Sequence, residues 1–178
     1  LALMLIAPTI DGYQSGKPNS SSGCGTCHGS AGGVTPSLNG LPSDYTPGAA
    51  YSLTIGGTGT PAGSKGGFSL TVNNGVFSNP GTNAKIVSNS PTHSNTNSRS
   101  WTVTWSAPYG GSGTANFALA VNFVNGNVAA DSGDNWGTMT TCVGDAHVTI
   151  NPPSSSIAFS YTLLTLPTLC TLALPSAR

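Results

Sequence analysis

The stretch ANFALAVNF, residues 115–123, alternates large apolar side chains with smaller or polar ones. Its apolar side holds Ala115, Phe117, Leu119, Val121 and Phe123. Successive side chains of an extended chain point to opposite faces, so a period of two predicts a strand with one face in a core. This run is the longest of its kind in the sequence, and it indicates the fold class.

Shorter runs of the same period lie around it, at residues 51–55, 67–72 and 101–105. Between them lie Gly-, Pro- and Asn-rich turn signals, such as those at residues 73–75 and 108–111. Several short strands separated by such turns favour an all-β protein, built as an antiparallel sandwich with one face of each sheet in the core.

The composition agrees with this class and argues against several functions. The chain has 178 residues with 24 Gly and 13 Pro, five Lys or Arg, five Asp and no Glu. A net charge of zero gives no electrostatic footprint for nucleic acid or an anionic membrane surface. No phosphate-binding loop or G-x-S-x-G motif is present, and without Glu there is no Asp/Glu pair for glycoside hydrolysis. We therefore do not expect an enzyme.

The most specific motif is Cys24-Gly25-Thr26-Cys27-His28. Two thiols separated by two residues can add to the two vinyl groups of one porphyrin, and the following His can ligate the iron. The motif therefore predicts one covalent haem c, with Cys24 and Cys27 as thioether attachments and His28 as an axial ligand. Covalent haem attachment takes place outside the cytoplasm, so the protein is expected to be extracellular or on the cell surface.

Other interpretations of this motif remain open. A redox Cys-x-x-Cys normally opens a helix, but glycines follow here at positions 29, 32 and 33. Structural zinc needs further ligands, and Cys142 and Cys170 are single and distant. A plain disulfide between Cys24 and Cys27, or a chance match, is the remaining alternative.

An electron-transfer haem needs a second axial ligand, for which three residues are candidates. His93, in a Pro-, Ser- and Asn-rich loop able to fold over a haem face, is the preferred one. His147 lies in an expected strand, and Met139 suits core filling better than ligation. If neither histidine reaches the iron, the open site could bind a gas or a peroxide.

Two further groups of residues have functional and structural interpretations. Trp101, Trp105, Tyr109 and Trp136 are expected to be core or loop anchors, one or two of which could pack on the porphyrin edge. Asp131, Asp134 and Asp145 could supply oxygen ligands to calcium, but their spacing fits no EF-hand, so solvated turn residues are expected.

Three regions divide the chain. Residues 1–22 form an apolar N-terminal arm and a polar linker, residues 23–150 the haem-bearing sandwich, and residues 151–178 a C-terminal extension expected to be a strand. The first region contains the N-glycosylation sequon at Asn19. Once haem takes the first cysteine pair, Cys142 and Cys170 are expected to form a disulfide. Neither apolar terminus fits a membrane helix, so strand exchange into a homo-oligomer or filament is a candidate use for both.

The order of several short motifs resembles the reelin-type (reeler) domain. The motifs include Thr46-Pro47-Gly48, Gly75-Val76-Phe77, Thr92-His93-Ser94 and Trp105-Ser106-Ala107-Pro108. The sequence is most similar to the microbial choice-of-anchor V relatives, many of which carry Cys-x-x-Cys-His before the first strand. The resemblance covers roughly residues 23–140 and implies an exported, immunoglobulin-like β-sandwich held at the cell surface by a C-terminal anchor. This chain departs from the family in showing no complete spanning anchor.

Two functions follow as expectations. The first is an extracellular monohaem c-type cytochrome that carries electrons to an unknown redox partner, as a subunit of a surface assembly or filament. The second is a structural pilus-like or surface-layer subunit in which haem is secondary or absent.

Overall fold

The computed structural model describes residues 13–110 and 112–146, and this part of the chain contains strands and no helix. No helix capable of crossing a membrane is therefore found among these residues. The strands are β1 (Val34–Asn39), β2 (Asp44–Tyr45), β3 (Ala50–Gly59), β4 (Gly66–Val72), β5 (Val76–Ser78), β6 (Ala84–Val87), β7 (Ser90–His93), β8 (Trp101–Ser106), β9 (Ala115–Phe123) and β10 (Asn135–Asp145).

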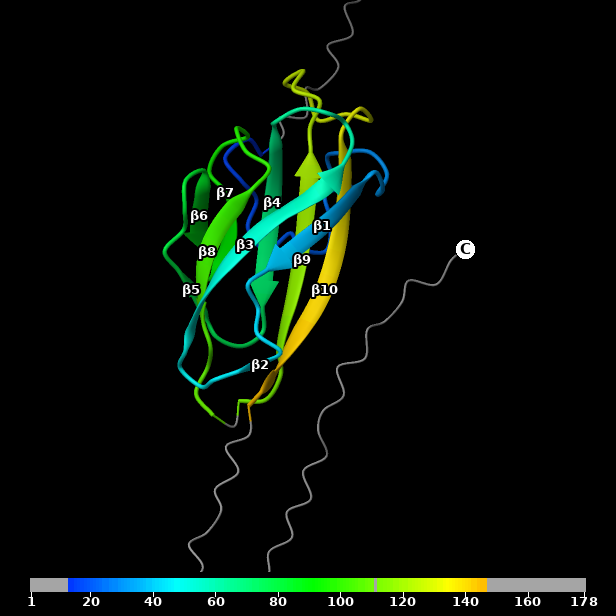
Figure 1. The fold of residues 1–178 in the computed structure, drawn as a ribbon. Helices are drawn as coiled ribbons and strands as arrows, with labels where there is room; N and C mark the ends of the chain where they lie inside the picture. Colours follow the sequence, from blue (N-terminus) through cyan, green and yellow to red (C-terminus); the bar gives the residue numbers. More distant parts are fainter. Residues whose placement is uncertain (1–12, 111, 147–178) are drawn as a thin grey trace, which may run out of the picture.

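The strands form two sheets that pack as the layers of a sandwich (Figure 1). One sheet has the order β1-β3-β8-β5, and the other has the order β2-β10-β9-β4-β7-β6. Neighbouring strands are antiparallel except β2 and β10, which pair in parallel over two positions. The expected all-β sandwich is confirmed, with this short parallel pairing as its one departure from an antiparallel arrangement in the described sheets.

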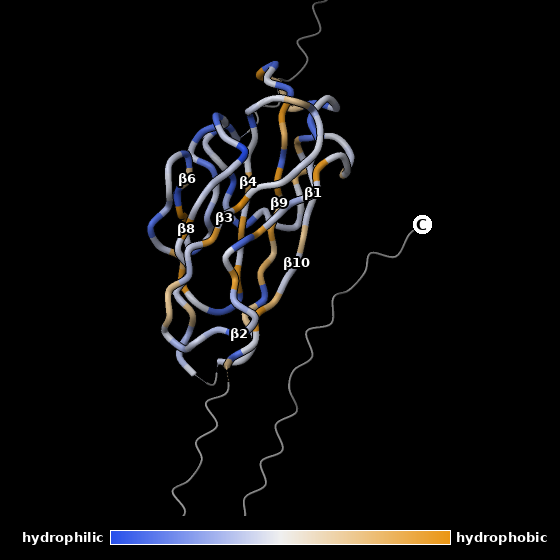
Figure 2. The backbone as a smooth tube through the Cα atoms, viewed as in Figure 1, coloured by the Kyte–Doolittle hydropathy of each residue, from blue (hydrophilic) through white to orange (hydrophobic). Residues whose placement is uncertain are grey.

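The core lies between the sheets and is centred on β9, which pairs with β10 on one side and β4 on the other. All the residues on its predicted apolar side are buried. Figure 2 shows the hydrophobic colour along much of this strand. Trp101 and Trp105, on β8 of the opposite sheet, fill the core. Met139, on β10 beside β9, is partly buried and packs against the core. Tyr109 is 85% exposed, so the expectation that it anchors the core or a loop was wrong.

Part of the outer face of the six-stranded sheet is also covered, although the alternation of β9 predicts a solvated face there. Asn122 of β9 is only 6% exposed. Residues 13–22 run across this face (Figure 1), where the backbone N–H of Ser20 donates to Ser69 Oγ and that of Asn19 to Ser90 Oγ, both at 2.9 Å. The sequence assigns these residues to a linker, but they form a layer on the sheet.

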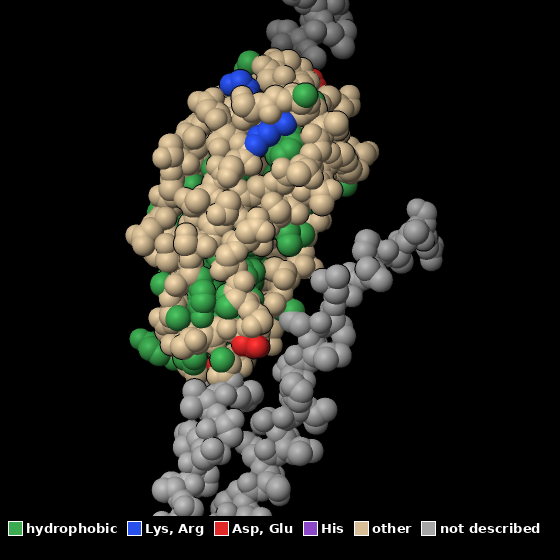
Figure 3. Space-filling view, viewed as in Figure 1, with side chains coloured by type: hydrophobic (Ala, Val, Ile, Leu, Met, Phe, Trp, Pro, Cys, Tyr) green, Lys and Arg blue, Asp and Glu red, His purple; other side chains and the backbone are tan. Residues whose placement is uncertain are grey.

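Charged side chains are few on the face shown in Figure 3, where Lys and Arg lie toward one end and acidic groups are seen at both ends. The predicted arm of residues 1–12 and the extension of residues 151–178 lie outside the described residues. So do His147 and Cys170, and the Cys142–Cys170 disulfide stays a prediction.

Candidate functional site

A pocket of about 240 Å³ lies between the six-stranded sheet and the segment that covers it. A water molecule occupies about 30 Å³ in the liquid, so the pocket has room for a sizeable organic group. Cys24, Cys27 and His28 line one side of it, and His93 lines another. The predicted attachment and ligand residues are therefore brought to one place.

The Cys-x-x-Cys-His segment forms a single tight turn. The backbone N–H groups of Cys27 and His28 both donate to the carbonyl of Cys24, at 3.2 and 3.0 Å. No helix follows the turn in the described chain. The turn places both thiols and the imidazole along the pocket, and it lacks the helix on which a redox dithiol relies.

The pKa of the Cys24 thiol also argues against a redox dithiol. Both cysteines are free thiols in the structure. Burial, with the neighbouring Cys27, raises the pKa of the Cys24 thiol to about 11. A catalytic redox cysteine needs a lowered pKa, because the thiolate is the attacking species. Cys24 therefore has the wrong electrostatics for a redox dithiol.

The indole ring of Trp136, on β10, supports this turn. Its Nε1–H donates to the carbonyl of Gly29 at 2.8 Å. A Cβ atom at Gly23 would lie 2.7 Å from the ring, and one at Gly25 would lie 3.0 Å from it. Glycine at these positions lets the turn lie directly on the ring. Trp136 is thus a loop anchor, as the sequence predicted.

His28 is held by a buried carboxylate. Its Nδ1 donates to Asp134 Oδ2 at 2.7 Å, since an ionised carboxylate can only accept. Asp134 is 1% exposed, and its other oxygen accepts the backbone N–H of Asn125 at 3.0 Å. This bond fixes the ring and its tautomer, and it leaves Nε2 of His28 available as a metal ligand.

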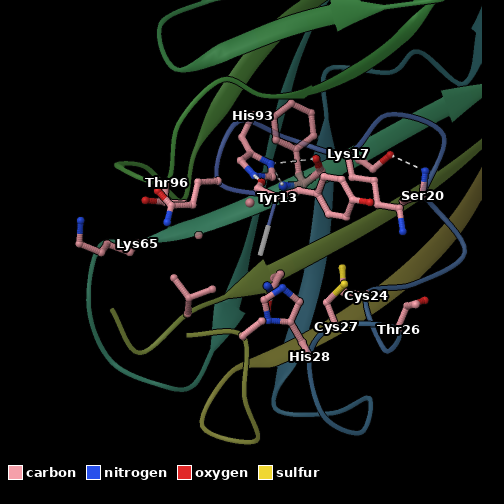
Figure 4. Close-up of a pocket in the computed structure, with 18 of the residues that line it drawn as sticks. Tyr13, Lys17, Ser20, Cys24, Thr26, Cys27, His28, Lys65, His93 and Thr96 are labelled. Carbon is pink, nitrogen blue, oxygen red and sulfur yellow. Dashed lines mark hydrogen bonds between the residues drawn. The ribbon is translucent and has the colours of Figure 1, made fainter. Parts of the chain in front are cut away.

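His93, at the end of β7, faces His28 across the pocket (Figure 4). Its Nε2 donates to the carbonyl of Tyr13 at 3.0 Å, and its Nδ1 lies 3.1 Å from the backbone N of Phe68 and 3.3 Å from the Phe68 carbonyl. A Cβ atom at Gly67 would lie 2.5 Å from the ring, so glycine is needed there. Burial lowers the pKa of His93, which favours the neutral ring.

One other expectation about this region was wrong, and one, that Met139 fills the core, is confirmed. Asp134 is buried against His28, so its interpretation as a solvated turn residue was wrong. Met139 packs against the core and is absent from the pocket lining. Among the described residues, no group of three or more His, Cys, Asp or Glu is arranged to hold a bare metal ion.

Sequence reasoning missed two residues of the site. Asp134 contacts His28 from 106 positions away, and no local pattern marks the pair. Asn122 lines the pocket with its Oδ1 buried and without a hydrogen-bond partner. An alternating strand gives no signal that its outward Asn faces a pocket rather than solvent.

Comparisons with known proteins give structural neighbours only. No protein-family model matches the chain, and no curated protein matches it. Among solved structures, the Reelin-N domain of F-spondin matches with 18% identity and a TM-score of 0.48, covering 75% of this chain and 94% of that one. The human F-spondin reeler domain, fragment 2, matches with 20% identity and a TM-score of 0.46, covering 68% and 98%.

Proposed function

We propose that this protein is an extracellular monohaem c-type cytochrome that carries electrons. The observation that carries the proposal is that one pocket brings together Cys24, Cys27, His28 and His93 from segments distant in the sequence. A haem bound there would supply one-electron redox chemistry at its iron, and the protein would set the potential through its ligands and its burial. This role requires no catalytic residue.

The residues of the pocket fit such a group. Cys24 and Cys27 would hold it through thioether bonds, and His28 would offer Nε2 to the iron while Asp134 orients the ring. The lining is mostly apolar and includes Phe68, Val124 and Val128. The unpartnered Oδ1 of Asn122 is also consistent with a bound group, because buried polar atoms normally find a partner.

His93 is proposed as the second axial ligand. To ligate through Nε2, it must release the carbonyl of Tyr13 and carry its proton on Nδ1. The Phe68 carbonyl, 3.3 Å from Nδ1, can then accept a hydrogen bond from Nδ1–H, while the Phe68 N–H, which donates to Nδ1 at 3.1 Å in this structure, loses its acceptor. The change therefore requires a tautomer exchange and the release of two backbone groups, the Tyr13 carbonyl and the Phe68 N–H.

The protein is further proposed to act as a subunit of a surface assembly, through strand exchange by residues 1–12 and 151–178. Tyr13, the residue that directly follows the first of these segments, lines the pocket, so subunit contacts made there would lie near the haem. Deleting residues 1–12 should convert the assembly to smaller species in sedimentation velocity. An unchanged distribution in this deletion and in one lacking residues 151–178 would contradict strand exchange.

Visible spectroscopy of the chain matured in cells competent for haem attachment tests the cytochrome proposal. The wild type should show c-type bands in the pyridine haemochrome assay and a low-spin spectrum. The His93→Ala variant should keep the covalent haem and become high-spin, whereas the matched His147→Ala variant should remain low-spin. Absence of haem from the wild type would overturn the proposal and leave a structural β-sandwich subunit.

A further inference from the structure

The pocket has two chemically different ends. Cys24 and Cys27 lie at one end, and Lys65 and Thr96 lie at the opposite end (Figure 4). Beyond Lys65 and Thr96 the pocket continues into an open, polar groove that is also lined by Ser94, Asn95 and Asn97. A group attached at the cysteines would therefore extend from an apolar chamber toward hydroxyl, amide and ammonium donors.

The asymmetry of haem matches this arrangement. The vinyl groups that form thioethers occupy one half of the macrocycle, and the two propionate groups occupy the other. Attachment at Cys24 and Cys27 therefore directs the propionates away from the cysteines. In this pocket that direction leads toward Lys65 and Thr96.

Lys65 is suited to receive a carboxylate there. Its backbone is held by Arg99, whose Nε donates to the Lys65 carbonyl at 2.7 Å and whose Nη1 donates to the Pro61 carbonyl at 2.7 Å. Its side chain is exposed, and its Nζ donates to Asn97 Oδ1 at 3.2 Å. The loop is thus anchored while the ammonium can move, and among the described residues no Asp lines the pocket to compete for it.

The second cation of the pocket is placed differently. Lys17 lies near the cysteines, with its Nζ 5.0 Å from the centre of the Tyr13 ring, and its charge acts on the Cys24 thiol. Two lysines thus line one pocket at its two ends. Lys17 is the matched control for a role that depends on position and not on charge alone.

We propose that Lys65, with Thr96 beside it, is a carboxylate subsite that binds the haem propionates. The inference rests on the proposed function, because the ligand is part of the haem. Pairing a propionate with an ammonium lowers the negative charge near the iron, and less negative charge favours the ferrous form. Lys65 therefore raises the reduction potential.

Potentiometric titration of the matured protein tests this subsite. Lys65→Met should carry the full complement of covalent haem and show a lower midpoint potential, and Lys65→Arg should restore the wild-type value. Lys17→Met should shift the potential less than Lys65→Met. The shift in Lys65→Met should shrink at high ionic strength, because salt screens exposed charges.

The results distinguish a failure of the Lys65 subsite from a failure of the cytochrome proposal. Normal haem content with an unchanged potential in Lys65→Met, or equal shifts in Lys65→Met and Lys17→Met, would overturn the subsite and leave the cytochrome standing. A wild type without covalent haem would overturn both.

Discussion

At the scale of single residues, the carboxylate of Asp134 sets the orientation and the tautomer of the His28 ring. Its two carboxylate oxygens have separate partners, His28 Nδ1 at 2.7 Å and the backbone N–H of Asn125 at 3.0 Å. A buried carboxylate behind an imidazole makes the ring a more basic ligand and fixes its orientation. One side chain thus ties the loop before β10 to the Cys-x-x-Cys-His turn.

Replacing Asp134 with Asn should affect both the stability of the protein and the properties of His28 as a ligand. An amide has a single oxygen, so it cannot accept all three hydrogen bonds that Asp134 accepts, from His28 Nδ1 and the backbone N–H groups of Asn125 and Asp131, and the free energy of unfolding should fall by about 1–3 kcal/mol. The midpoint potential should rise, because a less basic His28 stabilises ferric iron less. Urea denaturation and potentiometry measure the two effects.

The control for this variant is Asp44→Asn, in which an exposed carboxylate of β2 is changed. It should leave both quantities near the wild-type values. Equal midpoint potentials in the wild type and Asp134→Asn would contradict a role for the carboxylate in tuning His28.

The limits of sequence reasoning are clearest at this scale. Cys24, Cys27 and His28 could be selected from the sequence because their spacing is local, and the structure places all three on one pocket, while their role in haem attachment stays a prediction. His93 was selected because it was expected in a loop, which was wrong, since it is the last residue of strand β7. The structure places it across the pocket from His28. Asp134 and Asn122 could not be found, because their partners or surroundings are set by folding and not by neighbours in the sequence.

At the scale of elements, the alternation of residues 115–123 predicted both a strand and its buried side. It could not predict what covers the other side. A polar segment rich in Ser forms hydrogen bonds to outward side chains such as Ser69, and this pattern resembles an ordinary linker in the sequence. The sequence therefore did not show that residues 13–22 form a layer on the sheet and one wall of the pocket.

The turn and the Trp136 ring form a second element-scale unit, and two glycines with similar backbones test it. Gly23 has φ +144° and Gly32 has φ +137°, so alanine is strained at both. A Cβ at Gly23 would lie 2.7 Å from Trp136, whereas one at Gly32 would meet no atom within 4 Å. Gly23→Ala should cost about 1–3 kcal/mol more than Gly32→Ala, as overpacking does in cores.

Thermal or urea unfolding of the two variants measures this difference, and haem content after maturation gives a second readout. Gly23→Ala should carry less haem than Gly32→Ala, because the turn that holds the cysteines is displaced. Identical stability and haem content in the two variants would show that the turn does not depend on contact with the ring.

At the scale of the whole molecule, Tyr45 connects strand β2 to Gly113, in the segment before β9. It is fully buried, and its hydroxyl donates to the Gly113 carbonyl at 2.6 Å. Burial, and then the nearby Asp145, raise the pKa of Tyr45 above its usual value of 10.0. The folded protein therefore holds this proton more tightly than the unfolded chain does.

A group with a raised folded pKa gives stability that is complete below its unfolded pKa and is lost as the pH rises through the folded one. The wild type should lose stability above about pH 10 through this group. Tyr45→Phe should be less stable than the wild type at pH 8, by about 0.5–1.5 kcal/mol for the lost hydrogen bond. The difference should then shrink as the pH rises.

Urea denaturation between pH 8 and about 11 follows both curves across the tyrosine range. Tyr109→Phe, at a site that is 85% exposed, should follow the wild-type curve. Parallel curves for Tyr45→Phe and the wild type would show that Tyr45 does not contribute to the alkaline loss.

The contacts that close the pocket have a consequence for how it is filled. His28 meets Asp134 from 106 positions away, and His93 meets Tyr13 from 80 positions away. Contacts of such separation form late, because loop-closure entropy is lost before they can stabilise the chain. A freely diffusing cofactor would find no finished cavity during most of folding. A tethered one has an effective concentration of about a millimolar at its site throughout, so it can template the closing walls. Under the proposed function, covalent attachment would thus assist folding, because the haem is held at its site before the pocket around it has formed.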